Sequence, residues 1–315
     1  MILYAVNVHT GGGKVLLDEL LSNEPFGKIT CAFLDSRYDR KSIGNGVTIN
    51  VYRPTILSRL KSQWDLFWKS WRTEEAPTIL LFGNTPPLLP MRGRSIVYLQ
   101  NCFLLPGIPV PRDSFRLWVR LWIERGLLFF CRPLFQELWV QTDWMVQAAR
   151  GRFGSLKIEK RPFLPTLPPP APFPKVYDII HVSSLASHKN FHTFALALDL
   201  LDEQVTSSVS VLVILDGNTR SPLLERRSYR NIQLEIRSKL SRNELFELYQ
   251  KSRISVISSS FESFCLPLYE SHHFGLEILA LDAPYSREIQ SISRYSENTA
   301  ESLRQGLLQH LRPGR

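Results

Sequence analysis

A proline-rich segment near the middle of the chain limits what this sequence can fold into. Residues 161–172 read RPFLPTLPPPAP. Each proline lacks an amide donor and restricts the residue before it, so neither a helix nor a strand ladder can run through the segment. We therefore predict a semi-rigid linker at residues 162–175, between an N-terminal domain of residues 1–161 and a C-terminal domain of residues 176–315.

Both halves alternate short apolar runs with amphipathic stretches, which is typical of doubly wound parallel sheets. In the first half we expect strands at residues 2–8, 29–34, 47–51, 78–82, 96–99 and 138–141 and helices at 15–21, 56–71 and 144–152. In the second half we expect strands at 177–182, 208–215, 232–236 and 254–258 and helices at 192–201 and 243–250. The latter helix has Ser241 as its cap.

The predicted fold class is α/β, with two Rossmann-like doubly wound domains that face each other across a cleft. A ligand crevice is then expected at the carboxyl ends of both sheets. The position of the last helix is left open, because this helix could cross back to the N-terminal domain.

The first candidate motif is HTGGGK at residues 9–14, between the first strand and the first helix. Contiguous glycines let the backbone turn tightly and approach a ligand, and a helix N-terminus offers amide donors. A purely structural turn explains these glycines equally well. The loop lacks the spaced glycine fingerprint of dinucleotide-binding proteins, which argues against a nicotinamide or flavin oxidoreductase.

Lys189 lies in the second candidate motif, SSLASHKN at residues 183–190, directly after the first strand of the second half. A lysine at the carboxyl end of a strand can pair with a diphosphate and offset the charge of a leaving group. A lysine that faces only water is the simpler alternative.

The third motif is SFESFCLPLYE at residues 260–270, which opens a helix at Pro267. Glu262 and Glu270 are eight positions apart, roughly 10 Å at about 1.5 Å per helical residue plus the loop. They are too far apart to share a proton, but they suit the two ends of a nucleotide sugar. Acidic residues that merely favour a helix N-terminus are the alternative.

The third motif and its continuation resemble the signature of the retaining glycosyltransferase family 4. The shared pattern is a Glu, seven residues, a second Glu, a glycine-containing strand and an Asp-Ala-Pro turn, here Glu262, Glu270, Gly275 and residues 282–284. Further elements follow the family's order, namely residues 11–13, Gln141-Thr142, His188-Lys189-Asn190 and Asp216-Gly217. The resemblance implies a GT-B fold and a retaining reaction that needs neither a metal nor a cofactor.

The resemblance also implies roles for individual residues. Lys189 faces the diphosphate, Glu262 lies beside the donor sugar and Glu270 faces the ribose. The expected donor-binding residues are Gly12, Gly13, Ser184, Lys189, Ser263, Phe264, Cys265, Leu266 and Glu270. A front-face substitution, in which the leaving phosphate helps to deprotonate the acceptor, is the implied mechanism.

Two departures from the family pattern concern residues that contact the donor. Serines stand where many members carry an arginine shortly before the lysine, and Arg220 or Arg242 could compensate. The first-domain histidine has no match, so Asn101 is expected to replace it as a third catalytic residue beside Glu262 and Lys189, with His9 a weaker candidate. A non-catalytic relative that binds nucleotides or polyanions is therefore an alternative.

The positive charge of the chain lies in its first half. Residues 1–160 carry 21 Lys and Arg against 13 Asp and Glu, a net of +8, whereas the remainder carries +1. This predicts attraction to an anionic surface such as a membrane, with a solvated basic face as the alternative. Residues 112–130 have helical spacing and fit either an interfacial helix or a helix buried against the first sheet.

The predicted partners are a nucleotide-sugar donor and a carbohydrate or lipid-linked acceptor. No nucleic acid is expected, because no nucleic-acid-binding motif is present. The N-terminus lacks signal-peptide features and the four cysteines lack paired spacing, which favours the cytoplasm or the inner face of the cell membrane. The predicted activity uses a UDP- or GDP-sugar in the biosynthesis of cell-surface polysaccharide, exopolysaccharide or lipopolysaccharide.

Overall fold

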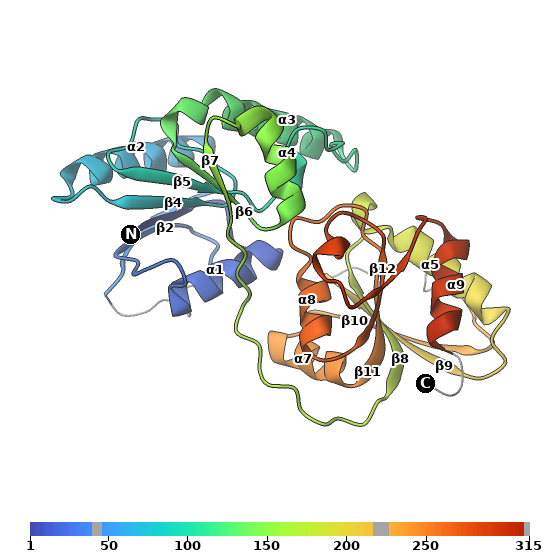
Figure 1. Cartoon of the computed structure of the whole chain (residues 1–315). Helices are drawn as coiled ribbons and strands as arrows, with labels where there is room; N and C mark the ends of the chain where they lie inside the picture. Colours follow the sequence, from blue (N-terminus) through green and yellow to red (C-terminus); the bar gives the residue numbers. More distant parts are fainter. Residues whose placement is uncertain (40–45, 217–226, 312–315) are drawn as a thin grey trace. The chain divides into compact units, whose positions relative to one another are not determined.

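The structure is a computed structural model that describes residues 1–39, 46–216 and 227–311. The chain divides into two compact units, Met1–Thr166 and Leu167–Arg315 (Figure 1). The boundary lies inside the proline-rich segment, and residues 161–176 contain neither helix nor strand. The cleft expected between the two domains stays a prediction.

The first unit is built on a parallel sheet that has seven strands in its described part, in the order β3-β2-β1-β4-β5-β6-β7. The strands are β1 (Ile2–Ala5), β2 (Cys31–Asp35), β3 (Thr48–Tyr52), β4 (Thr78–Phe82), β5 (Arg94–Tyr98), β6 (Glu137–Val140) and β7 (Lys157–Lys160). Strands β1, β2 and β6 are buried along their whole length. Parallel strands covered on both faces have this pattern, which confirms the predicted fold class.

Helices cover both faces of this sheet (Figure 1). They are α1 (Gly11–Asn23), α2 (Ile56–Arg72), α3 (Phe115–Phe130) and α4 (Asp143–Phe153). The connections through α2, α3 and α4 all cross the sheet in the same direction, opposite to the connection through α1. Because such crossovers are right-handed, α2, α3 and α4 share one face and α1 covers the other. No helix in the described ranges combines the length and apolar character needed to cross a membrane.

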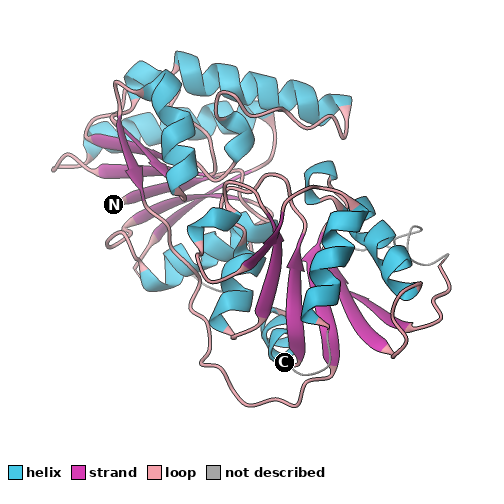
Figure 2. Cartoon of the chain, turned by 45° about the vertical axis from the view of Figure 1, so that its right-hand side comes forward, coloured by secondary structure: helices cyan, strands magenta, loops and turns pink. Residues whose placement is uncertain are grey.

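The second unit repeats the plan with a sheet whose described strands follow the order β10-β9-β8-β11-β12-β13 (Figure 2). The strands are β8 (Tyr177–Ser183), β9 (Val209–Leu215), β10 (Ile232–Ser238), β11 (Ser252–Ile257), β12 (Glu277–Leu281) and β13 (Ser293–Tyr295). Its helices are α5 (Phe191–Asp202), α7 (Arg242–Gln250), α8 (Leu266–His273) and α9 (Ala300–His310). Ser241 caps α7 through a capping box with Glu244, as predicted.

The last helix, α9, packs on α5 and on β13 of the second unit. Leu303 and Leu307 supply the buried face of α9. Gly306 allows the close approach, because a Cβ there would lie 2.9 Å from the side chain of Leu279 in β12.

Two outer strands, β7 and β13, were not predicted. Strand β7 reads KIEK and is partly exposed, and β13 has only three residues. Neither has the apolar run that identifies a buried strand. Each is an edge strand in the described part of its sheet and has a neighbouring strand on one side only, which explains why it needs no such run.

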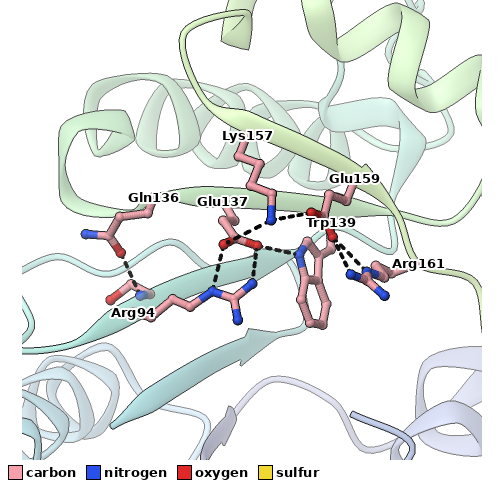
Figure 3. Close-up of polar contacts among 8 residues, drawn as sticks. Arg94, Gln136, Glu137, Trp139, Lys157, Glu159 and Arg161 are labelled. Atoms are coloured by element: carbon pink, nitrogen blue, oxygen red, sulfur yellow. Dashed lines mark hydrogen bonds and ion pairs between the residues drawn. The ribbon is translucent and has the colours of Figure 1, made fainter. Parts of the chain in front are cut away.

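An ionic network joins β7 to its neighbours (Figure 3). Arg94 in β5 donates two hydrogen bonds of 2.7 Å to Glu137 in β6, and Trp139 Nε1 donates a third of 2.9 Å. Lys157 in β7 lies 3.7 Å from Glu137 and also pairs with Glu159. The hydrogen bonds from Arg94 lower the pKa of Glu137 and outweigh the opposing effect of burial.

Replacing Glu137 by glutamine should lower the free energy of unfolding by about 1–2 kcal/mol at neutral pH, an effect limited by the exposure of Arg94. Because the folded pKa lies below the unfolded value of about 4.3, this contribution is present above that value and is lost as the pH falls through the folded pKa. Urea unfolding at neutral and acidic pH checks this. The difference from wild type should disappear in acid, and a constant difference would mean that Glu137 acts through packing.

Candidate functional site

The strand order of the second unit reverses direction between β8 and β11. Strands β9 and β10 lie on one side of this point and β12 and β13 on the other. Loops that leave the carboxyl ends of two such strands diverge, and the crevice between them is where open α/β sheets bind ligands. Lys189 is in the loop after β8 and Glu262 is in the loop after β11.

The structure brings Lys189 and Glu262 into a direct ion pair between Nζ and Oε1. Their side chains are 23% and 13% exposed, so the pair is partly desolvated but reachable. A diphosphate carries more negative charge than a carboxylate and would compete with Glu262 for the ammonium group. The ammonium group of Lys189 can therefore act as an anion site, for which a diphosphate and the carboxylate of Glu262 would compete.

Hydrogen bonds hold the two loops of this site together. Asn190, in the left-handed region with φ 51°, donates through Nδ2 to the carbonyl of Ser258 at 2.7 Å and to Ser260 Oγ at 2.6 Å. The amide of Ser260 donates to the carbonyl of His188 at 2.8 Å. The backbone around Lys189 is thus fixed against the loop that carries Glu262, which favours preorganised binding.

The other residues of this unit that are expected to bind the donor lie close in sequence to Lys189 or to Glu262. Ser184 Oγ accepts from the amide of Ala186 at 3.5 Å. Residues 263–266 lead into α8, where the ring of Phe264 stacks on Tyr269 with centroids 4.4 Å apart. Burial raises the pKa of the Cys265 thiol, so this side chain stays neutral.

Glu270 is almost fully buried in α8, and Arg242 at the start of α7 pairs with it. Arg242 Nη2 lies 2.5 Å from Glu270 Oε1, and the guanidinium group stacks 4.5 Å from the ring centroid of Phe246. Burial raises the pKa of the neighbouring Tyr249, and the charge of Glu270 adds to this. Arg242, one of two candidates to replace the missing arginine, is therefore engaged by Glu270. The other candidate, Arg220, lies outside the described residues.

The glycine motif lies at the equivalent reversal point of the first unit, between β1 and β4. Gly11 has a φ of +63°, and a Cβ on Gly13 would lie 3.0 Å from Gln100 Oε1. Both glycines thus have structural reasons to be glycine. Gly12 is exposed at the start of α1 and can present its amide to a ligand.

Asn101 follows β5 and belongs to a hydrogen-bonded turn. The side-chain oxygen of Asn84 accepts from the amides of Gln100 and Asn101 at 2.7 and 2.9 Å. Asn101 Oδ1 in turn accepts from the amide of Phe103 at 3.0 Å and caps a short 3-10 turn. The side-chain oxygen of Asn101 therefore serves to hold this turn. Only the side-chain NH2 group of Asn101 fits the catalytic role assigned from the sequence.

Three buried polar atoms in this part of the first unit have no hydrogen-bond partner among the described residues. They are Asn7 Oδ1, His9 Nδ1 and Gln100 Nε2. Buried polar atoms are normally paired, so these three atoms could accept partners that the described residues do not supply. Asn7 and Gln100 were not among the predicted site residues, although each is a polar residue just after an apolar strand, where ligand-binding residues commonly lie.

Residues 168–291, which include Lys189, Glu262 and Glu270, carry the sequence similarity to known proteins. They match the family Glycosyl transferases group 1. No curated protein matches the sequence.

Solved structures extend the similarity to the whole chain. An α,α-trehalose-phosphate synthase (UDP-forming) from Burkholderia xenovorans is 13% identical with a TM-score of 0.66, over 99% of this chain and 92% of that one. Anabaena HepE, solved in complex with UDP and glucose, is 13% identical with a TM-score of 0.64, over 99% and 90%. The predicted GT-B fold is confirmed.

Proposed function

We propose that this protein is a retaining glycosyltransferase of family 4 that moves a sugar from a UDP- or GDP-sugar to a saccharide or lipid-linked acceptor. The observation that supports this most is the Lys189–Glu262 ion pair at the strand reversal, inside the residues that match Glycosyl transferases group 1. Among the similar structures, one is UDP-forming and another is in complex with UDP and glucose, which favours a uridine nucleotide.

In the proposed reaction Lys189 binds the diphosphate and offsets the charge that grows as its bond to the anomeric carbon breaks. The acceptor oxygen bonds to that carbon from the face that the diphosphate leaves. The acceptor proton passes to the departing phosphate oxygen, so the step needs no metal and no separate base. Glu262 and the backbone of residues 263–266 then position the sugar. Gly12, Gly13 and Asn101 keep in this proposal the roles that the sequence resemblance implies.

Glu270 is proposed to accept hydrogen bonds from the ribose hydroxyls. Arg242 holds the carboxylate of Glu270, whose side chain is only 1% exposed. Arg242 is a third exposed and is therefore the more accessible member of the pair. We expect nucleotide binding to move this arginine, because ribose contact requires one carboxylate oxygen to become reachable.

The proposed location is the cytoplasm at the inner face of the cell membrane, in the biosynthesis of cell-surface polysaccharide, exopolysaccharide or lipopolysaccharide. The net charge of +8 in residues 1–160 supports attraction to an anionic bilayer.

A thermal-shift panel of UDP-, GDP- and ADP-sugars, with NAD⁺ and DNA as controls, tests the function. A ligand at 100 times its Kd stabilises the folded state by about 2.7 kcal/mol, so a UDP- or GDP-sugar should raise the Tm most. Sugar transfer is then measured with the donor found. A shift without turnover of any donor would favour the non-catalytic alternative, and no shift with any nucleotide would contradict the proposal.

A further inference from the structure

An ordinary surface helix buries its apolar face. Helix α2 instead buries mainly polar residues and exposes its apolar face. The residues that α2 buries are Ser62, Gln63, Leu66 and Ser70. Their polar atoms have partners in the first unit. Ser62 Oγ lies 2.7 Å from the hydroxyl of Tyr4, and Ser70 Oγ accepts from the amide of Arg92 at 3.1 Å. Apart from Leu66, helix α2 is thus attached to the first unit mainly by hydrogen bonds, and most of its large apolar residues lie outside.

The exposed side of α2 carries an apolar stripe that we call the tryptophan face. Its members are Leu57, Leu60, Trp64, Trp68 and Trp71, each between 41% and 80% exposed. Their spacing of three or four residues places them on one side of the helix. The rings of Trp64 and Trp68 pack edge to face with centroids 5.8 Å apart. Few soluble surfaces expose large apolar groups in so continuous a row, so this face indicates a binding partner.

Helix α3 has the same character. It buries only Leu121 and Leu128. Its exposed apolar residues are Phe115, Trp118, Trp122, Ile123, Leu127 and Phe130. The alternative of a helix buried against the sheet therefore does not describe α3. Because α2 and α3 cover the same face of the sheet, both apolar surfaces belong to one side of the first unit (Figure 1).

Positive charges accompany both apolar surfaces. The sequences of α2 and α3 together contain seven Lys and Arg and two acidic residues. The two acids, Asp65 and Glu124, are each paired with a cation of their own helix, at 2.5 Å from Lys61 and 2.7 Å from Arg120. Arg59, Lys69, Arg72 and Arg116 are exposed as well. The partner must accordingly accept apolar side chains and carry negative charge beside them.

We propose that the tryptophan face of α2 and the exposed face of α3 bind together to the surface of an anionic lipid bilayer. Tryptophan favours the boundary between headgroups and acyl chains, and lysine and arginine beside it contact anionic headgroups. A second copy of the chain would bring like charges together, which disfavours it as the occupant. The proposal rests on the proposed membrane location, which it deepens by naming the surface, and it needs no step of sugar transfer.

Sedimentation of the full chain with vesicles tests this surface. We expect binding to phosphatidylcholine vesicles that contain phosphatidylglycerol, weaker binding at high salt, and little binding to pure phosphatidylcholine. Trp64→Ser with Trp68→Ser should reduce the affinity for anionic vesicles about tenfold, because two interfacial anchors are lost. Leu196→Ser is the matched control, since Leu196 is exposed on α5 of the second unit. It should bind vesicles as the wild type does.

Three results would overturn the proposal: wild-type protein that ignores anionic vesicles, a double tryptophan variant that binds them equally well, or a wild-type dimer that the double variant converts to a monomer. The double variant should also keep the wild-type thermal shift with nucleotide sugars. A failure of membrane binding can therefore be told apart from a failure of the proposed sugar transfer.

Discussion

A Lys189→Ala variant should turn over its donor about 100 to 1,000 times more slowly than the wild type while it remains folded. The reason is the role of Lys189 in the proposed reaction, where its ammonium group at the strand reversal binds a diphosphate that gains charge as it leaves. Release of nucleoside diphosphate, followed with the donor that the thermal-shift panel identifies, measures the effect. Nucleotide affinity should fall as well, since a charge-assisted hydrogen bond is lost.

The companion variant Glu262→Gln should separate binding from turnover. Without the competing carboxylate of Glu262, a diphosphate should bind the Lys189 ammonium group at least as well, so nucleotide affinity should equal or exceed that of the wild type although turnover drops. Lys251→Ala is a matched control, because Lys251 pairs with Glu247 one helical turn away and lies outside both loops of the site. Wild-type turnover in Lys189→Ala, or equally weakened nucleotide binding in Glu262→Gln, would contradict the assigned roles.

Replacing Arg242 by alanine should lower the free energy of unfolding by about 3 kcal/mol, the low end for a buried ion pair broken from one side. The variant leaves the carboxylate of Glu270 buried without its cation. The partial exposure of Arg242 keeps the loss near this lower limit. Urea unfolding at neutral pH, monitored by fluorescence, measures it.

A double variant and a surface control support the interpretation of Arg242→Ala. Adding Glu270→Gln should restore part of the stability, because a neutral amide is less costly to bury than an unpaired carboxylate. Arg253→Ala removes a more exposed pair with Asp178 and should cost less than about 1 kcal/mol. If the double variant is no more stable than Arg242→Ala alone, the arginine acts mainly through its packing on Phe246.

The candidate site of the second unit could be predicted in position but not in contacts. Lys189 and Glu262 each follow an apolar strand, and the topology of parallel sheets brings the carboxyl ends of such strands together. That the two side chains bond to each other, across 73 residues of sequence, depends on loop conformation and has no periodic signal. The ion pair between Arg242 and Glu270 could not be predicted either, because the number of residues between them does not indicate a contact.

The first unit shows a different limit of sequence reasoning. The periodicity of residues 56–71 predicted a helix, and α2 is there. Periodicity alone does not say which side faces the sheet, and the apolar side is ordinarily taken as the inner one. Here the inner positions belong to serine and glutamine, because their partners Tyr4 and the backbone near Arg92 are fixed by distant parts of the fold.

The proline-rich segment is fastened on each side of the unit boundary. The amide and hydroxyl groups of Thr166 bond to Glu19, whereas the carbonyl of Pro168 accepts from His273 Nε2 at 2.8 Å. Only Leu167 separates Thr166 from Pro168, so the segment is held by hydrogen bonds to each unit directly beside the boundary. Loss of either set of bonds would return conformational freedom to a segment whose prolines already limit it.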